Sequence, residues 1–410
     1  MTKSTVIIGG GQAGFTAADS LRRAGYSEPI TIVDAQDHLP YQRPPLSKAH
    51  LGDGAQPASP HFRPADFFAQ NQIDLVLDER LVSVDPERRT VTLSAGARLP
   101  YTDLVIATGS RLRSWQAPGA DLEGVHRLHD MADADALRAG LVGASHLCVV
   151  GGGFIGLEVA SAARKRGIGV TVIEAGERLM ARALTPVSSA AMDRIHRQAG
   201  IEIVYGRPVR QVLGQRRVAG VELDDGRVID ADLVVVGIGS VPAVRADEVG
   251  VAGALDGALL VDAAMRTSLP HVWGCGDGVN FPLGPRRLRL ESVQNATDQA
   301  RCVAEGIVNR PRPYVAVPWF WTEQHGRRVQ IAGLLDEADE CVVRGEPGAD
   351  SWTVFGFAGG RLVGGESVGA VRDHLAIRSM LGRHINLTAD QATDPDFDLK
   401  AHSAAVPART

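Results

Sequence analysis

The chain has 410 residues, 44% of them hydrophobic and 22% charged, which is long enough for two or three domains with separate cores. Its formal net charge of −5 argues against a general nucleic-acid-binding protein, which usually presents a basic face. No apolar run reaches the ~18 residues of a membrane-spanning helix, and the first expected strand begins at Thr5, which leaves no room for a signal peptide. We therefore expect a cytoplasmic protein that binds neither nucleic acid nor membrane.

The N-terminal part of the chain predicts a β-α-β unit with the spacing of a mononucleotide-binding half. The predicted elements are, in order, a strand, a helix, a strand, a proline-rich loop and two strands, over residues 5–8, 13–24, 30–33, 38–48, 91–93 and 103–109. The near-continuous apolar runs in these strands are typical of parallel sheets buried on both faces.

The same pattern recurs in the middle of the chain. A connecting helix, a strand, a second helix after a glycine turn, and another strand are predicted over residues 131–141, 147–150, 155–166 and 170–173. The run D-L-V-V-V-G-I-G at 232–239 mirrors D-L-V-I-A-T-G at 103–109. We interpret this self-similarity as an internal duplication of a nucleotide-binding architecture.

The C-terminal part has a different character. A helix over 292–308 and a proline-rich joint at 309–313 lead into it. Four stretches of strand-like alternation and a helix are then predicted, over residues 328–333, 341–344, 352–357, 362–364 and 372–381. This pattern predicts a smaller α+β domain.

Each β-α-β unit carries a G-x-G-x-x-G turn between a strand and a helix. The first glycine permits a tight bend, the second lets backbone N–H groups approach a pyrophosphate, and the third lets helix and strand pack closely. The helix N-terminus attracts the phosphate through its unpaired N–H groups. The glycines of the two turns are Gly9, Gly11 and Gly14, and Gly151, Gly153 and Gly156.

An acidic residue ends the next strand in each unit. Asp34 and Glu174 stand about 20 residues beyond their turns, where a carboxylate accepts hydrogen bonds from an adenosine ribose. Glu174 also repels a 2′-phosphate, which favours NADH over NADPH. Arg178 and Arg182 are near enough in sequence to leave NADPH as an alternative.

Two dinucleotide sites in one chain suggest a flavin and a nicotinamide. Asp277, in G-C-G-D-G, can contact a flavin ribityl hydroxyl if the chain returns to the first domain after completing the second. We therefore expect two Rossmann-like domains, the second inserted in the first, with FAD on the first turn and NADH on the second. The predicted boundaries are 1–111 and 240–317 for the FAD domain, 112–239 for the NADH domain and 318–410 for the α+β domain.

These motifs resemble the FAD-dependent NADH:ferredoxin reductases of bacterial oxygenase systems, of the putidaredoxin reductase and biphenyl dioxygenase reductase type. The resemblance is carried by G-G-G-Q-A-G, P-Y-Q-R-P-P-L-S-K, A-T-G-S, G-G-G-F-I-G-L-E, G-C-G-D, E-S-V-Q-N-A-T-D-Q-A and V-P-W-F-W-T-E-Q, which run the length of the chain. It implies a glutathione-reductase-like arrangement of the two dinucleotide-binding domains.

The resemblance also implies roles for individual residues. Lys48 and Glu158 would form a catalytic pair near flavin N5, with Arg43 by the FAD pyrophosphate and Trp321 near the flavin edge. Glu291 would border the nicotinamide. The remaining implied cofactor contacts are Leu81, Ala107, Thr108, Gly109 and Val293 for FAD, and Ile155 and Gly239 for NAD.

Two positions depart from the family pattern. Many members place the ribose acid where this chain has Ala35, so either Asp34 or Asp37 would serve. Many also carry an arginine where this chain has His129, so either His129 substitutes for it or Arg127 takes its place.

The four cysteines are expected to be small buried side chains, because they show no Cys-x-x-Cys pair and no metal-ligand spacing: Cys148, Cys275, Cys302 and Cys341. Residues 35–60 contain no cysteine, whereas disulfide and peroxide reductases of this architecture carry a redox cysteine there. Electrons would therefore leave the flavin for an external acceptor.

By resemblance, that acceptor is a 2Fe-2S ferredoxin serving a haem-thiolate monooxygenase or a ring-hydroxylating dioxygenase. Docking would be transient and steered by charge, with Arg310 and Arg312, joined by Arg327 and Arg328, as the candidate patch. The protein itself would be a monomer or a weak dimer. The alternatives are a rubredoxin reductase and an NADH-responsive interaction protein like apoptosis-inducing factor.

Overall fold

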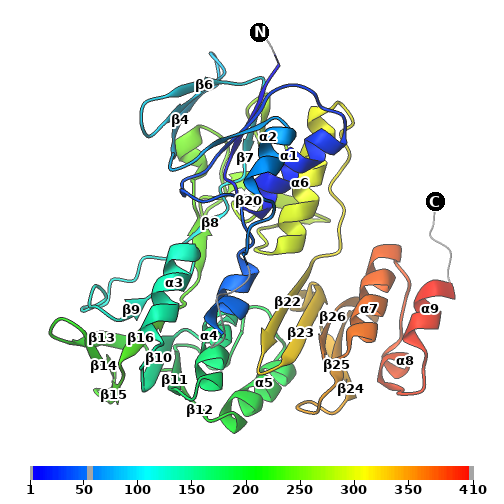
Figure 1. The fold of residues 1–410 in the computed structure, drawn as a ribbon. Coiled ribbons are helices and arrows are strands. Elements are labelled where there is room, and N and C mark those ends of the chain that lie inside the picture. Colours follow the sequence, from blue (N-terminus) through cyan, green and yellow to red (C-terminus); the bar gives the residue numbers. More distant parts are fainter. Residues whose placement is uncertain (1–2, 53–58, 406–410) are drawn as a thin grey trace. The chain divides into compact units, whose positions relative to one another are not determined.

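The computed structural model describes residues 3–52 and 59–405 (Figure 1). The chain forms two compact units, which we call the first unit (3–43, 59–113 and 240–316) and the second unit (44–52, 114–239 and 317–405). The chain thus leaves the first unit and returns to it. Residues 44–52, which the sequence analysis assigned to the first domain, cluster with the second unit.

The first unit is built on a five-stranded parallel sheet in the order β19-β7-β1-β2-β3. Its strands are β1 (Thr5–Ile8), β2 (Ile30–Val33), β3 (Ile73–Val76), β7 (Asp103–Ile106) and β19 (Val272–Gly274). Strand β19 lies beside β7 although it follows the whole middle part of the chain. This pairing confirms that the second dinucleotide-binding domain is inserted in the first.

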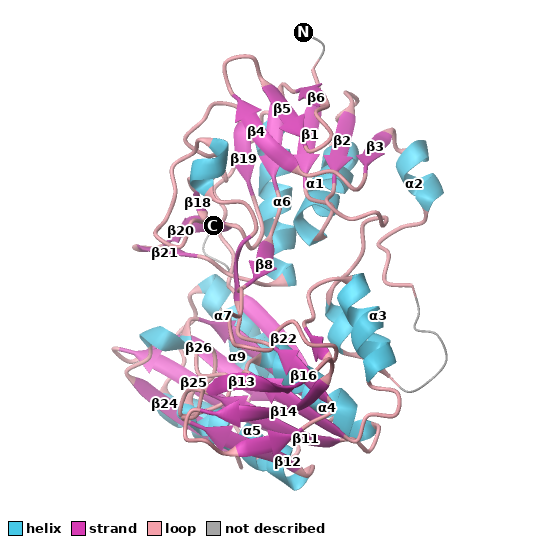
Figure 2. Ribbon diagram, turned by 90° about the vertical axis from the view of Figure 1, so that its left-hand side faces the viewer, coloured by secondary structure: helices cyan, strands magenta, loops and turns pink. Residues whose placement is uncertain are grey.

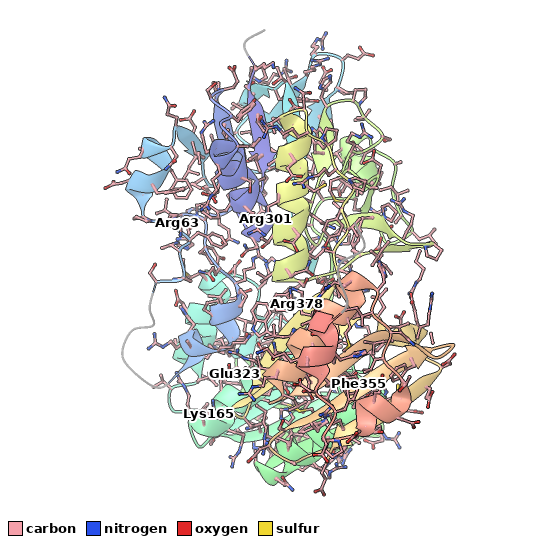
Figure 3. All side chains as sticks on the ribbon, turned by 90° about the vertical axis from the view of Figure 1, so that its right-hand side faces the viewer. Arg63, Lys165, Arg301, Glu323, Phe355 and Arg378 are labelled. Carbon is pink, nitrogen blue, oxygen red and sulfur yellow. The ribbon has the colours of Figure 1, made fainter. Side chains whose placement is uncertain are left out.

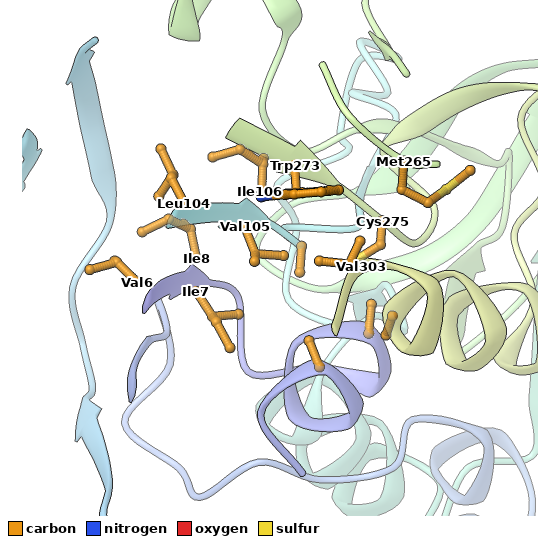
Figure 4. Close-up of a cluster of buried hydrophobic side chains, with 14 of the residues drawn as sticks. Val6, Ile7, Ile8, Leu104, Val105, Ile106, Met265, Trp273, Cys275 and Val303 are labelled. Atoms are coloured by element: carbon orange, nitrogen blue, oxygen red, sulfur yellow. The ribbon is translucent and has the colours of Figure 1, made fainter. Parts of the chain in front are cut away.

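The core of the first unit lies where this sheet meets two helices, α1 (Gln12–Arg23) and α6 (Val293–Ile307). Figure 4 shows side chains of β1 and β7 together with Trp273, Cys275 and Val303 in this core. Gly276 has φ +85° and lies so close to α1 that an added Cβ would be 3.1 Å from Ala13. Small residues therefore bring α1 and α6 onto the sheet.

Smaller elements complete the first unit. They are helix α2 (Ala65–Gln70), an antiparallel sheet of β4 (Leu81–Asp85), β5 (Thr90–Leu93) and β6 (Arg98–Pro100), the pair β8 (Ser110–Leu112) and β17 (Ser240–Pro242), the short helix η3 (Ala246–Val249), and a sheet of β18 (Leu259–Leu260), β20 (Val279–Leu283) and β21 (Arg286–Leu288). Strands β8 and β17 pair at the two places where the chain passes between the units.

The second unit repeats the parallel sheet, in the order β12-β11-β10-β16-β9. Its strands are β9 (Val125–His126), β10 (His146–Val150), β11 (Gly169–Glu174), β12 (Ile201–Tyr205) and β16 (Leu233–Val236). The other elements of this part are α3 (Met131–Gly140), α4 (Phe154–Lys165), α5 (Pro186–Gln198) and the antiparallel strands β13 (Val209–Gly214), β14 (Val218–Leu223) and β15 (Val228–Asp230). The predicted duplication is therefore present in four strands of each sheet, while the edge strand β9 precedes β10 in the chain and its counterpart β19 follows β7.

The C-terminal part adds an antiparallel five-stranded sheet to the second unit, in the order β22-β23-β26-β25-β24 (Figure 2). The elements are β22 (Trp319–Gln324), β23 (Arg327–Gly333), η4 (Leu335–Glu337), β24 (Glu340–Gly345), β25 (Trp352–Ala358), β26 (Arg361–Val368), α7 (Val371–Arg383), α8 (Ala389–Thr393) and α9 (Leu399–Ala405). The prediction for Cys341 was wrong: the residue is exposed, because β24 is an edge strand, whereas the other three cysteines are buried. None of the helices in the described part of the chain has both the length and the hydropathy to cross a membrane.

A buried carboxylate joins this sheet to the rest of the second unit. Glu366 on β26 is fully buried and accepts hydrogen bonds from the backbone N–H of Thr185 at 2.5 Å and from its hydroxyl at 2.7 Å. Thr185 is the N-cap of α5. Burial raises the pKa of Glu366, while the two Thr185 bonds act in the opposite direction.

We expect Glu366→Ala to lower the free energy of unfolding by about 3 kcal/mol, because it leaves two buried donors of Thr185 without an acceptor. Chemical denaturation followed by circular dichroism measures the change. Glu323 of β22 is exposed and serves as the matched control (Figure 3); Glu323→Ala should change the value by less than about 0.5 kcal/mol. Equal effects of the two substitutions would contradict the role of Glu366.

Candidate functional site

The first glycine turn has the geometry that its sequence predicts. Gly9 has φ +107°, and a Cβ added there would lie 2.3 Å from the carbonyl oxygen of Ala107. A Cβ on Gly14 would lie 1.8 Å from the carbonyl oxygen of Gly9. Around Gly11, in contrast, there is open space, since nothing would come within 4 Å of its Cβ. Two glycines thus make the turn possible, and the third leaves the helix N-terminus accessible to a phosphate.

The second turn reproduces this geometry. Gly151 has φ +108°, and a Cβ there would lie 2.4 Å from the carbonyl oxygen of Gly237. A Cβ on Gly156 would lie 2.4 Å from the oxygen of Gly151, while the space around Gly153 is open. Both turns therefore present unpaired N–H groups of a helix N-terminus in the same way.

The two predicted acids lie at their turns. Asp34 accepts the N–H of Gly10 at 2.5 Å, and Glu174 accepts the N–H of Gly152 at 2.7 Å. Each carboxylate thus lies at the end of β2 or β11, beside the position where a ribose would bind. Asp37, the alternative to Asp34, is 76% exposed and contacts His38 at 3.3 Å instead.

A cleft adjoins the first turn and lies wholly within the first unit. It is lined by Gly10, Gly11, Asp34, Gln36, His38, Leu39, Pro40, Tyr41 and Arg43. Tyr41 donates to the side chain of Gln36 at 2.6 Å, which orders this wall. The combination of a carboxylate, backbone N–H groups and an arginine fits an adenosine diphosphate group, because the acid can accept from ribose hydroxyls and the arginine can pair with a phosphate.

Asp277 lies in a cluster of charges in the same unit. Its backbone carbonyl accepts Arg289 Nη1 at 3.1 Å, and the same arginine pairs with Glu291 at 2.6 Å. Ser240 donates to Glu291 at 2.6 Å. Burial and the nearby charge of Glu291 raise the pKa of Asp277 to about 7, although Arg43 and Arg289 act in the opposite direction. Asp277 is partly buried, and its carboxyl group is suited to hydrogen-bonding a hydroxyl.

The second unit brings Lys48 and Glu158 together. Lys48 Nζ lies 2.8 Å from Glu158 Oε2, and the hydroxyl of Ser47 donates to the same oxygen. The hydroxyl of Thr322 donates to Oε1 at 2.6 Å. The side chain of Glu158 is only 4% exposed, against 25% for Lys48. A buried carboxylate of this kind is tolerated because an ammonium and two hydroxyls occupy its acceptor positions.

Further contacts anchor the segment that carries Lys48. The segment forms two short helices, η1 (Pro44–Ser47) and η2 (Ala49–Leu51). His50 Nε2 lies 2.7 Å from Asp135 of α3. Arg166, at the end of α4, donates to the carbonyl oxygens of Leu51 at 3.0 Å and Gly52 at 2.7 Å. Lys48 is therefore held on the second unit from both sides.

The other predicted contacts are distributed over both units. In the first unit, Ala107, Thr108 and Gly109 follow β7, Leu81 begins β4, and Val293 begins α6. In the second unit, Ile155 is 47% exposed at the start of α4, and Gly239 follows β16. Their roles remain predictions.

Two uncertain positions, His129 and Arg127, lie in the second unit. The backbone N–H of His129 donates to Asp133 at 2.9 Å, and Arg127 is exposed.

Trp321 belongs to an aromatic group on β22, with its ring 5.5 Å from that of Trp319. The guanidinium of Arg378, on α7, lies 4.3 Å from the centroid of the Trp319 ring.

Comparison with known proteins agrees with this architecture. Residues 3–300 match the model of the pyridine nucleotide-disulphide oxidoreductase family, and residues 319–403 match the reductase C-terminal family. The rhodocoxin reductase of Rhodococcus erythropolis is 44% identical over 401 residues, covering 97% of this chain and 93% of that protein. The chain belongs to the pyridine nucleotide-disulphide oxidoreductase family. Within it, the chain is one of the ferredoxin reductases of oxygenase systems.

Solved structures of ferredoxin reductases have the same fold. The ferredoxin reductase of the CYP199A2 system from Rhodopseudomonas palustris is 40% identical, with a TM-score of 0.94 over 98% of this chain and 100% of that chain. Putidaredoxin reductase in its covalent complex with putidaredoxin also has a TM-score of 0.94, at 31% identity over 98% of both chains. The glutathione-reductase-like fold is confirmed, and the family is one of enzymes that use FAD and NAD(H).

Two partners of Glu158 were missed by the sequence analysis. Ser47 precedes Lys48 in P-P-L-S-K, and Thr322 follows Trp321 in V-P-W-F-W-T-E-Q. In a strand, alternate side chains point to opposite faces, so Thr322 faces away from the tryptophans that drew attention to this motif. That alternation was a usable signal for Thr322, whereas the adjacency of Ser47 to Lys48 indicated nothing by itself.

We expect Asp34→Ala to weaken FAD binding by about tenfold or more, because the carboxylate can accept charge-assisted hydrogen bonds from a ribose. The measurement is the FAD dissociation constant of apoprotein, followed by quenching of flavin fluorescence. Asp37→Ala is the matched control and should leave the constant unchanged within about twofold. A larger loss in Asp37→Ala than in Asp34→Ala would assign the ribose to Asp37.

Proposed function

We propose that this enzyme passes electrons from NADH through FAD to a 2Fe-2S ferredoxin that serves an oxygenase. The observation that carries the proposal is the full-length match to reductases named for ferredoxins and oxygenase systems, among them those of anthranilate and biphenyl dioxygenases. The cysteine-free sequence of residues 35–60 supports an external acceptor, since a disulfide reductase needs a redox cysteine there.

In this proposal the first unit holds FAD. Gly11 and Arg43 would contact the pyrophosphate, Asp34 the ribose, and Asp277 the ribityl chain. Bound FAD would accept a hydride from NADH and release the electrons one at a time. Among residues of the second unit, Lys48 would supply positive charge toward the flavin, and Glu158 would keep that ammonium in place.

The second glycine turn would hold NADH. Glu174 would face the adenosine ribose and would repel a 2′-phosphate. The guanidinium of Arg178 donates to the carbonyl oxygens of Leu184 at 2.6 Å and Ala181 at 2.8 Å, so it is engaged by the backbone. A guanidinium that is bonded to the backbone is less available to a 2′-phosphate, which supports NADH over NADPH. Because the reaction consumes NADH, an intracellular reductant, we also propose a cytoplasmic location.

The relatives do not favour the rubredoxin alternative, since those compared here are named for ferredoxins, rhodocoxin or terpredoxin. An NADH-responsive interaction protein would oxidise NADH slowly and hold a long-lived charge-transfer complex. The rate of NADH oxidation with an added electron carrier therefore distinguishes a reductase from an NADH-responsive interaction protein.

We expect NADH to drive cytochrome c reduction at least about tenfold faster when a 2Fe-2S ferredoxin is added, because the carrier accepts single electrons. The rate is followed by cytochrome c absorbance, with NADPH and a rubredoxin in parallel reactions. Slow NADH oxidation with every carrier would reject the proposal. Faster turnover with rubredoxin than with ferredoxin would identify rubredoxin as the acceptor.

Three of the four arginines in the predicted docking patch lie near a carboxylate of this chain. Arg312 pairs with Glu305, Arg327 with Asp350 at 2.8 Å, and Arg328 lies 4.0 Å from Glu323. Arg310 is exposed, and within residues 3–52 and 59–405 it has no carboxylate partner. Arg310 is therefore the stronger candidate for an acidic ferredoxin.

We expect Arg310→Glu to lower kcat/KM for ferredoxin by about tenfold at low salt, because it reverses the charge that steers association. Arg98 of β6 is also exposed, and Arg98→Glu is the matched control with the same change of charge. The difference between the variants should shrink as salt is added. A loss that is equal in both variants, or independent of salt, would remove Arg310 from the docking site.

A further inference from the structure

The carboxylate of Glu158 ends a continuous line of hydrogen bonds through the second unit. Thr322 Oγ1 lies 2.6 Å from Glu158 Oε1, and Gln324 Nε2 lies 3.1 Å from Thr322 Oγ1. His196 Nε2 lies 2.8 Å from Gln324 Oε1. His325 Nε2 lies 3.1 Å from His196 Nδ1. We call Thr322, Gln324, His196 and His325 the Glu158 chain.

The Glu158 chain is buried for most of its length. Thr322, Gln324 and His196 have no exposed surface, and His325 is half-buried in the turn after β22. The backbone N–H of His325 donates to Ser161 of α4 at 2.7 Å, which fixes the outer end. The line therefore joins three elements, α4, β22 and α5, and leads from the Lys48 pair toward the surface.

The charge of Glu158 determines the direction of every bond in this line. An ionised carboxylate only accepts, so Thr322 must donate to it and its oxygen must accept from the amide of Gln324. The Gln324 carbonyl oxygen then faces His196, which must carry its proton on Nε2. The bare Nδ1 of His196 can only accept, so His325 donates from Nε2. All four donors point toward the carboxylate.

Both histidines are neutral near pH 7. Burial lowers the pKa of His196, and burial together with the nearby cations Lys165 and Arg164 lowers the pKa of His325 to about 4. The Glu158 chain therefore adds aligned dipoles and no second cation that would compete with Lys48 for the carboxylate. Aligned donors polarise one another, which strengthens the last bond.

We propose that the Glu158 chain holds the Glu158 carboxylate in the orientation that places Lys48 for NADH oxidation. Thr322, Gln324 and His196 are thus positioning residues for the reaction, although they act only through Glu158. This inference rests on the proposed function of the Lys48 pair. It gives the C-terminal sheet a role in the reduction of FAD by NADH, because β22 supplies two of these residues.

The kinetic test compares hydroxyl removal at two buried threonines of the same sheet. Thr322→Val should slow the reduction of bound FAD by saturating NADH about tenfold, because a hydrogen bond to a charged group is lost. The affinity for NADH should change little. Thr322→Ser keeps the hydroxyl and should restore the rate within about twofold. Thr353 of β25 is fully buried and donates to Asp373 at 2.9 Å, so Thr353→Val is the control that should leave the rate unchanged.

A second measurement tests the direction of the hydrogen bonds in the Glu158 chain in the absence of catalysis. Nitrogen-15 NMR of histidine-labelled protein, with His196 assigned by comparison with His196→Gln, should report a proton on Nε2 of His196. In Thr322→Val the Gln324 amide loses its oxygen acceptor and keeps only the weak contact to Met180 Sδ at 3.6 Å, so the amide can turn over and the preference for this tautomer should weaken. Thr353→Val should keep it. If Thr322→Val does not fold, Gln324→Met interrupts the line one bond further out and is measured in the same ways.

The outcomes separate the inference from the proposed function. A proton on Nδ1 of His196 in the unsubstituted protein, or a flavin reduction rate unchanged in a folded Thr322→Val, would overturn the positioning role. If NADH fails to reduce FAD in the unsubstituted protein, the proposed function fails, while the NMR result still decides whether the line is directed toward Glu158.

Discussion

The burial of the Glu158 carboxylate constrains much of the second unit. A carboxylate that is 4% exposed has lost most of its water, so its acceptor positions must be filled by protein donors. Those donors come from two distant parts of the chain: Ser47 and Lys48 from the segment before η2, and Thr322 from the C-terminal sheet. The segment 44–52 and strand β22 must therefore both pack against α4.

This constraint explains why residues 44–52 belong with the second unit although the chain around them builds the first. The segment is tied to α3 and α4 by His50 and Arg166 as well as by Lys48. The C-terminal sheet is tied in through a second buried carboxylate, Glu366, which caps the start of α5 with Thr185. Two buried acids thus join the segment 44–52 and the C-terminal sheet to the helices of the second unit.

The two glycine turns show how one geometry can serve two ligands. Both turns have a first glycine near φ +108° and an acid bonded to the second residue of the glycine triplet. Each acid also accepts the N–H two residues further on, from Gln36 at 3.0 Å and from Gly176 at 2.7 Å. The first turn in addition opens on a cleft whose wall includes Gln36, Tyr41 and Arg43. The glycines and the acids are therefore alike in the two turns, and the flanking segments differ in sequence.

The sequence by itself determined the local elements, both turns and the acid Glu174, left a choice between Asp34 and Asp37, and indicated the inserted topology through the G-C-G-D-G motif. These features depend on short-range rules, since glycine spacing and apolar periodicity are written in neighbouring residues. Only the tertiary structure decided that Asp34 rather than Asp37 lies at the turn, that Cys341 is exposed, and that Thr322, Gln324, His196 and His325 lead to Glu158. The bonds Glu158–Thr322, Gln324–His196 and His196–His325 each join residues more than 100 positions apart, and such a bond leaves no local pattern. Burial then makes each of them obligatory, because an unpaired polar group inside the protein is costly.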